Sequence, residues 1–206
     1  MFITGGRAGQ VMFFAVLGIL TFQYFNTQKF KAIVVVLIVS STIFFTAYQT
    51  SNMFLTRVNN AIYDIQEYES HKNTSLGQRV SFAINSWEVI KDNPIIGVGT
   101  GDFPLEYKKV NMKNTPELSN ATNPHNMYIL VTSQLGLIGL ASFLSIFYFQ
   151  FQKAFNSTNR LLSDVGFAMP IMFLVIMFSD SYLLGHFTTL MYIFFGSFLY
   201  KDFESS

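Results

Sequence analysis

A histidine at the start of a long apolar run is the residue best suited to acid–base chemistry in this chain. His125 lies in the stretch Asn123-Pro124-His125-Asn126. Asn is a favoured helix N-cap and Pro suits the first helical position, so we predict that His125 lies in the first turn of a helix. The positive helix end and partial burial both disfavour imidazolium, which leaves the neutral imidazole that a general base requires. The alternative is a histidine that only forms structural hydrogen bonds.

An arginine near the start of a second predicted helix could bind an anion. Residues 75–93 have the helical apolar period, with Ser75 and Gln78 spaced as a capping box. Arg79 would lie in the first turn, where unpaired N–H groups and a guanidinium together suit a phosphate. A solvated surface arginine is the alternative. The apolar face of this helix should consist of Val80, Ala83, Ile84, Trp87 and Ile90.

Three glycines follow this helix in the stretch 97–103. Gly97, Gly99 and Gly101 permit positive φ and a close approach of backbone. Their successive N–H groups could form an anion nest, but a plain tight turn is the default interpretation. The stretch is not a dinucleotide fingerprint, because its third glycine is misplaced and no strand–helix unit surrounds it.

The composition indicates a membrane protein. Of the 206 residues 50% are hydrophobic and 12% charged, whereas soluble chains carry about 25% charged residues. The net charge of +1 is uninformative, and no basic tract suggests nucleic acid as a partner. The absence of Cys excludes disulfides and thiolate chemistry. No D-x-D carboxylate pair or histidine spacing suggests a metal site, so we predict neither metal nor cofactor.

The apolar runs predict an all-α protein with about five membrane-spanning helices. Three spans are expected at 8–24, 32–48 and 127–151. The run 165–200 is too long for one span and should form two helices, because Asp180 and His186 interrupt it. Ionisable residues in such a run are functional candidates, unless they simply lie in a surface turn.

The short loops set the orientation of these spans. Their lysines and arginines share one face, which the positive-inside rule makes cytoplasmic. The polar segment 49–124 would then form one long, partly helical periplasmic loop. Arg7 also falls on the outer face, against the rule, which favours a functional role. We expect a single membrane domain over 1–206, the C-terminal part of a longer protein.

The spacing around His125 resembles a known family signature. His125-Asn126, nine residues, then Gly136-x-x-Gly139 is similar to the motif of the O-antigen ligase and polymerase family. Members of this family are multi-span bacterial enzymes that handle glycans linked to undecaprenyl diphosphate.

Two further elements agree with that resemblance, and their order along the chain matches as well. Arg79 is followed by Trp87, Pro94 and the glycine stretch 97–103, and Thr4-Gly5-Gly6-Arg7 opens a span. Family members often carry Ser just before this last arginine, where the chain has glycine.

The resemblance implies a role for each matching residue. His125 would be the base that activates the acceptor hydroxyl, and Arg7 and Arg79 would bind the lipid diphosphate. Residues expected to support the site are Asn126, Gly97, Gly99, Gly101, Gly136 and Gly139.

The implied reaction is glycan transfer from undecaprenyl diphosphate to a sugar hydroxyl, inverting and metal-independent, on the periplasmic face of the bacterial inner membrane. Ligation to lipid A-core in lipopolysaccharide biosynthesis is favoured. The alternatives are O-antigen polymerisation and protein O-glycosylation. A transporter and an inactive fragment are the hypotheses from other classes.

Overall fold

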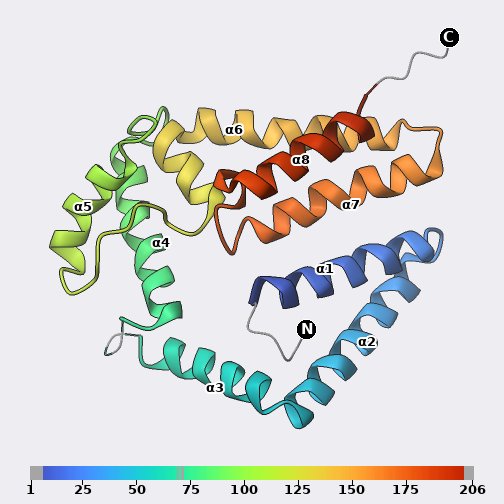
Figure 1. Ribbon diagram of the computed structural model, residues 1–206, viewed down its shortest axis with the longest axis horizontal. Coiled ribbons are helices and arrows are strands. Elements are labelled where there is room, and N and C mark those ends of the chain that lie inside the picture. Colours follow the sequence, from blue (N-terminus) through green and yellow to red (C-terminus); the bar gives the residue numbers. More distant parts are fainter. Residues whose placement is uncertain (1–6, 69, 71, 202–206) are drawn as a thin grey trace. The chain divides into compact units, whose positions relative to one another are not determined.

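The computed structural model describes residues 7–68, 70 and 72–201, and this part of the chain is helical without strands. Eight α-helices and one 3₁₀ turn follow one another (Figure 1). Their bounds are α1 Arg7–Tyr24, α2 Lys29–Thr50, α3 Asn52–Gln66, α4 Ser75–Asp92, α5 Phe103–Asn114, α6 Met127–Phe155, α7 Arg160–Ile176, η1 Tyr182–Leu184 and α8 His186–Leu199. The all-α prediction is confirmed.

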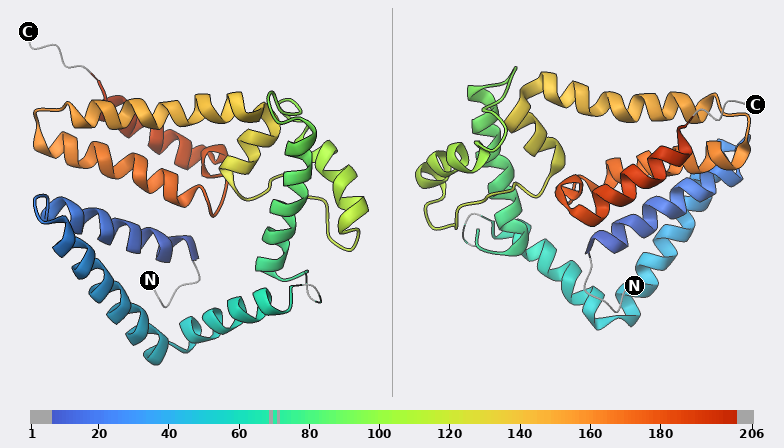
Figure 2. Two further views of the ribbon diagram at one scale, coloured as in Figure 1. Left: turned by 180° about the vertical axis from the view of Figure 1, so that it is seen from behind. Right: turned by 45° about the horizontal axis from the view of Figure 1, so that its top comes forward.

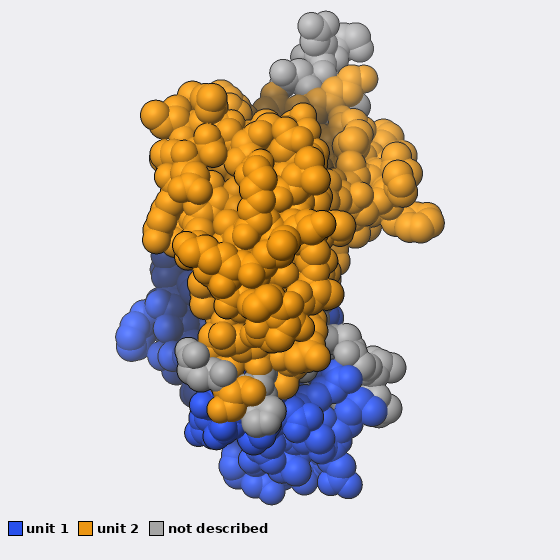
Figure 3. Space-filling model, turned by 90° about the vertical axis from the view of Figure 1, so that its left-hand side faces the viewer, with its two compact units in different colours: residues 1–67 blue, residues 68–206 orange. Residues whose placement is uncertain are grey.

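The chain divides into two compact units, residues 1–67 and 68–206 (Figure 3). The boundary falls inside the segment 49–124 that the sequence predicts to be one outer loop. The first unit contains α1, α2 and α3, and the second contains the remaining helices. A single domain over 1–206 and the periplasmic location of 49–124 stay predictions.

Two of the described helices, α2 and α6, are long and apolar enough to cross a bilayer. The stretch Gly9–Tyr24 of α1 and the whole of α8 are shorter apolar helices. The expected break in the run 165–200 is confirmed, because α7 ends at Ile176 and α8 begins at His186. Five spans therefore stay a prediction, whereas the helical segmentation behind it is largely confirmed.

In the first unit, one serine joins two helices. Ser51 is the C-cap of α2 and the N-cap of α3, where its side chain accepts a hydrogen bond from the Phe54 amide. Phe54 also packs edge-to-face on Phe44, with ring centroids 5.3 Å apart. The helix α3 is a feature that the sequence analysis did not predict.

In the second unit, α4 buries a face that differs in part from the one predicted. Ser81, Asn85 and Ser86 are buried, whereas Ile84 and Trp87 are 49% and 56% exposed. The helix also begins one residue earlier than the capping box suggests, because Thr74 is the N-cap and accepts from the Gly77 amide. The predicted apolar face is wrong at Ile84 and Trp87, whereas Ile90 is buried as predicted.

A polar network accounts for the buried polar residues of α4. Asn85 donates hydrogen bonds to Thr115 at 2.7 Å, to Tyr107 at 3.3 Å and to Asn111 at 3.4 Å. Burial raises the pKa of the Tyr107 phenol, although the hydrogen bond from Asn85 acts in the opposite direction. Because buried polar groups need partners, this network helps to specify the α4–α5 pairing, beside the apolar contact of Phe82 with Tyr107.

The long helix α6 is bent near its start and runs beside α7 along its second part (Figures 1 and 2). The bend lies at Gly136, whose φ of 65° and ψ of −166° are not helical. Only glycine adopts such angles readily. The residues Met127–Leu135 before the bend therefore follow a direction of their own, and His125 lies just ahead of them.

Candidate functional site

His125 precedes α6 instead of lying in its first turn. The helix begins at Met127 and its N-cap is Asn126, whose side chain accepts a hydrogen bond from the Ile129 amide at 3.1 Å. His125 has a φ of 52°, outside the right-handed helical region. The predicted cap at Asn123 and the first-turn position of His125 are both wrong.

Tertiary contacts explain why Asn123 does not cap the helix. Its side-chain oxygen accepts hydrogen bonds from the His125 amide at 2.9 Å and from the Ser181 hydroxyl at 2.8 Å. Asn123 therefore holds the backbone of His125 and joins it to the segment after α7. The positive end of α6 bears less directly on the imidazole than the sequence suggests.

An aspartate lies beside the imidazole of His125. The Nδ1 atom of His125 and the Oδ1 atom of Asp180 are 3.1 Å apart, and the same oxygen accepts from the Ser181 amide at 2.7 Å. A carboxylate at Nδ1 favours the tautomer that carries its proton there. The lone pair is then on Nε2, as a proton acceptor requires.

The imidazole ring packs on a buried aromatic side chain and is still partly exposed to solvent. The ring stacks on Phe82 of α4, with centroids 5.9 Å apart and planes inclined by 26°. Phe82 itself is buried, whereas the side chain of His125 is 42% exposed. The arrangement holds the ring in place and leaves it accessible to a substrate.

The turn 177–181, between α7 and η1, accepts hydrogen bonds from several residues of the site. The Met127 amide donates to the Met177 carbonyl at 3.0 Å, and the Asn126 side chain donates to the Phe178 carbonyl at 3.2 Å. Arg79 Nη1 donates to the Ser179 carbonyl at 2.9 Å. The predicted residues His125, Asn126 and Arg79 therefore meet on one short turn that also carries Asp180.

Arg79 lies one residue further into α4 than predicted, because the helix begins after Thr74. It donates one hydrogen bond to the turn 177–181, and its other N–H groups have no hydrogen-bond partner within the described part of the chain. A guanidinium has five N–H donors. Arg79 can therefore hold its place on the turn and still bind an anion.

Asp180 was not among the residues predicted for the site. Its signal in the sequence was an ionisable residue that interrupts an apolar run. His186 gave the same signal, but it is the exposed first residue of α8. Only the folded chain shows that Asp180 pairs with His125.

Two glycine-containing segments, the connection between α4 and α5 and the bend of α6 itself, are joined by backbone hydrogen bonds. Ser133 and Gln134 of α6 accept hydrogen bonds from the amides of Val98 and Gly99, both at 2.9 Å. In a regular helix these carbonyls would accept from residues four positions later. The connection between α4 and α5 thus replaces part of the hydrogen-bond ladder of α6.

The connection between α4 and α5 also accepts backbone hydrogen bonds from α6. The amides of Leu137 and Ile138 donate to the carbonyls of Pro94 at 2.8 Å and Ile95 at 3.2 Å. The backbones approach so closely that a Cβ on Gly97 would lie 2.3 Å from the carbonyl carbon of Gln134. A Cβ on Gly136 would lie 2.1 Å from the Ile95 oxygen.

The remaining predicted glycines have simpler roles. Gly99 and Gly101 adopt positive φ, as the sequence indicated. A Cβ on Gly139 would lie 2.1 Å from the Cβ of Leu135 across the bend. Because the amides of Val98 and Gly99 already donate to α6, they are not free to form an anion nest. The two glycine motifs are structural partners.

Arg7 opens α1 in the first unit, but its side chain lies outside the described residues, as does the motif Thr4-Gly5-Gly6. Nothing in the described structure tests its predicted role. Among the described residues, no group of three or more His, Asp or Glu side chains could hold a metal ion.

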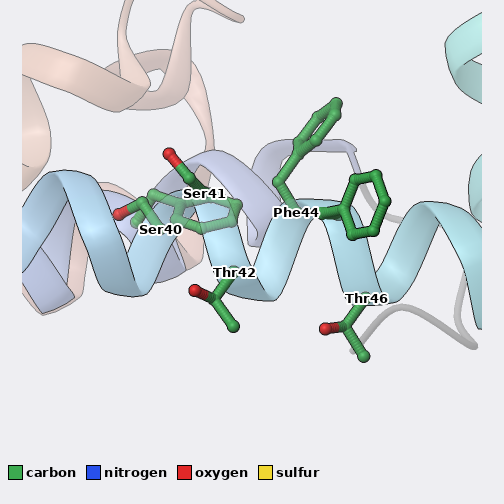
Figure 4. A pocket seen from close by; sticks show the side chains of 7 residues that line it. Ser40, Ser41, Thr42, Phe44 and Thr46 are labelled. Atoms are coloured by element: carbon green, nitrogen blue, oxygen red, sulfur yellow. The ribbon is translucent and has the colours of Figure 1, made fainter.

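The first unit carries an open pocket of about 770 Å³ on α1 and α2. Figure 4 shows the hydroxyl groups of Ser40, Ser41, Thr42 and Thr46 distributed along α2. The Thr42 hydroxyl donates back to the Ile38 carbonyl of its own helix. Since no acid, base or cation among the described residues lines this pocket, the site at His125 is the stronger candidate for chemistry.

Comparison with known proteins shows the family of the chain. A family model described as O-antigen ligase, Wzy_C, matches residues 1–144, which include His125 and Arg79. A Haemophilus influenzae protein described as uncharacterized is 32% identical over 166 residues, 76% of this chain and 41% of that protein. The chain thus spans less than half the length of this relative.

Proposed function

The chain belongs to the O-antigen ligase family, and on that premise we propose that it transfers a glycan from undecaprenyl diphosphate to an acceptor hydroxyl. The observation that carries this proposal is the His125–Asp180 pair beside Arg79 on the turn 177–181. A base with an orienting carboxylate and a cation beside it are what such a displacement needs.

In the proposed reaction His125 Nε2 accepts the proton of the acceptor hydroxyl as the oxygen attacks the anomeric carbon. The bond from that carbon to the diphosphate oxygen breaks in the same step, which inverts the carbon. Asp180 stabilises the imidazolium that forms. Arg79 bears the charge of the departing diphosphate, and Arg7 shares this task according to the family resemblance, in place of a metal ion.

The family's membrane association and the apolar helices support a location in the bacterial inner membrane. We propose that α6 crosses the bilayer and presents His125 to the periplasm, with about five spans in total. We favour ligation to lipid A-core as the reaction, with polymerisation and protein O-glycosylation as alternatives within the family.

A transfer assay tests this function. The chain is reconstituted in liposomes with radiolabelled undecaprenyl-diphosphate-linked glycan and, in separate reactions, each class of acceptor. We expect label to move to one acceptor in the presence of EDTA. Uptake of label without transfer would support a transporter, and transfer that requires an added divalent metal would contradict the proposed mechanism.

Replacing Asp180 by Asn tests the orienting carboxylate. The amide keeps the shape of the side chain but can present an N–H to His125 Nδ1, which favours the wrong tautomer. We expect a loss of transfer of about 10²-fold or more, because the base is then misprotonated. The measurement is kcat at saturating donor, with KM for the donor little changed. If kcat were unchanged and the whole loss appeared as a rise in KM for the donor, the assignment would be contradicted.

A further inference from the structure

Four exposed apolar side chains gather at the bend of α6. Ile95 and Ile96, in the connection between α4 and α5, are 61% and 71% exposed, and Leu137 and Ile138 of α6 are 57% and 59% exposed. Figures 1 and 2 show this connection lying against the bend. We name Ile95, Ile96, Leu137 and Ile138 the kink surface.

Backbone hydrogen bonds join the two parts of the kink surface. The amides of Leu137 and Ile138 donate to the carbonyls of Pro94 and Ile95. An open groove of about 500 Å³ continues from Ile96 along α6 as far as Ile146, and its lining is almost wholly apolar. Ile95 and Ile96 therefore lie at about the same depth relative to the membrane as Leu137.

The length of α6 indicates where that level lies. The straight part Leu137–Phe155 is about 29 Å long at ~1.5 Å per residue. This length matches the ~30 Å hydrocarbon core of a bilayer. If α6 crosses the membrane as proposed above, Leu137 lies at the outer boundary of the hydrocarbon.

The backbone at the bend is compatible with lipid. Irregular backbone is tolerated at membrane depth only where its polar groups are satisfied. Here the carbonyls of Ser133 and Gln134 and the amides of Leu137 and Ile138 all have partners in the α4–α5 connection. The exchanged hydrogen bonds thus remove the penalty that a broken helix would otherwise incur.

Residues of α4 continue the surface towards the headgroups. Trp87 is 56% exposed, and Lys91, one turn later on the same face, is exposed as well. Trp is enriched at membrane interfaces, and Lys extends its ammonium group towards water from such positions. Trp87 lies about 8 Å before the end of α4, at ~1.5 Å per residue.

We propose that the kink surface inserts into the acyl chains of the outer leaflet, with Trp87 at headgroup level. This inference relies on the proposed membrane crossing of α6, and it makes part of the segment 49–124 a membrane-docking element. The docking sets the height of His125 above the bilayer, where a lipid-linked diphosphate would present its glycosidic bond.

The single tryptophan of the chain provides the probe. The full chain is placed in nanodiscs of phosphatidylethanolamine and phosphatidylglycerol, some carrying lipids brominated at a shallow or a deep acyl position. We expect Trp87 fluorescence to be quenched more by the shallow bromines. In a Trp87→Phe background, Ile96→Trp should be quenched by both bromolipids and protected from aqueous iodide.

A matched control comes from α5, where Leu105 is 62% exposed, close to the value for Ile95. Leu105→Trp in the same background should be quenched by iodide and not by bromolipids. If Ile96→Trp behaves like this control, lipid insertion is wrong. If it is shielded from both quenchers, a protein partner covers the kink surface and the proposal also fails.

The test depends neither on catalysis nor on unequal folding of the variants. Fluorescence quenching requires no glycan transfer, so an inactive chain that shows the expected quenching contradicts the proposed function and supports the docking. Helix content from circular dichroism must match between Ile96→Trp and Leu105→Trp. If Ile96→Trp loses helix content, Ile95→Trp is measured instead, with the same expected quenching.

Discussion

Replacing His125 by Asn is expected to lower glycan transfer by about 10²–10⁴-fold, the usual contribution of a general base. Asn is the appropriate substitute because His125 has a φ of 52°, a conformation that Asn adopts more readily than most residues. Ala at this position would add backbone strain to the loss of the base. The measurement is the initial rate of transfer, at equal amounts of protein in the membrane.

The matched control is His186→Asn. His186 is exposed at the start of α8 and makes none of the contacts that define the site. This variant should retain transfer within about twofold, since surface substitutions away from special features have small effects. Transfer by His125→Asn at the level of His186→Asn would show that His125 is not the base.

Replacing Gly136 by Ala is expected to destabilise the protein by at least about 3 kcal/mol. The new Cβ would lie 2.1 Å from the Ile95 oxygen, a backbone atom that cannot rotate away. The φ of 65° and ψ of −166° add strain of their own. We expect a loss of folded, monodisperse protein in detergent and a lower midpoint of thermal unfolding.

Gly101→Ala separates strain from collision. Gly101 also has a positive φ, 91°, but a Cβ there meets nothing within 4 Å. This variant should be destabilised by about 1–2 kcal/mol, the usual penalty for a left-handed residue. Equal effects of Gly101→Ala and Gly136→Ala on the unfolding midpoint would mean that the close approach of the two backbones is unimportant for stability.

Residue types and spacing in the sequence were sufficient for the family and for much of the segmentation. The spacing from His125 to Gly136 and Gly139 is a local property of the chain, and it indicated the family that the comparisons then showed. The positive φ of Gly97, Gly99 and Gly101 was also foreseeable, because glycine is the residue that adopts such angles without steric cost.

The predictions that failed depended on competition between local and tertiary partners. Asn123 and Asn126 are both good N-caps, but the side chain of Asn123 is taken by His125 and Ser181. The apolar period of α4 predicted burial of Ile84 and Trp87, which are exposed. The same helix buries Asn85, which donates hydrogen bonds to Tyr107 and Asn111 of α5. Period and propensity describe a helix alone, and they do not include the partner that satisfies a buried amide.

The site itself combines both kinds of information. From the sequence alone, His125 and Arg79 were candidates because a base and a guanidinium are suited to acid–base chemistry and to a diphosphate. Only the tertiary structure placed Asp180 at 3.1 Å from His125 and Arg79 on the same turn. The physical reason is that the turn 177–181 binds α4 and the start of α6 through backbone carbonyls, which every residue type possesses and no sequence pattern reveals.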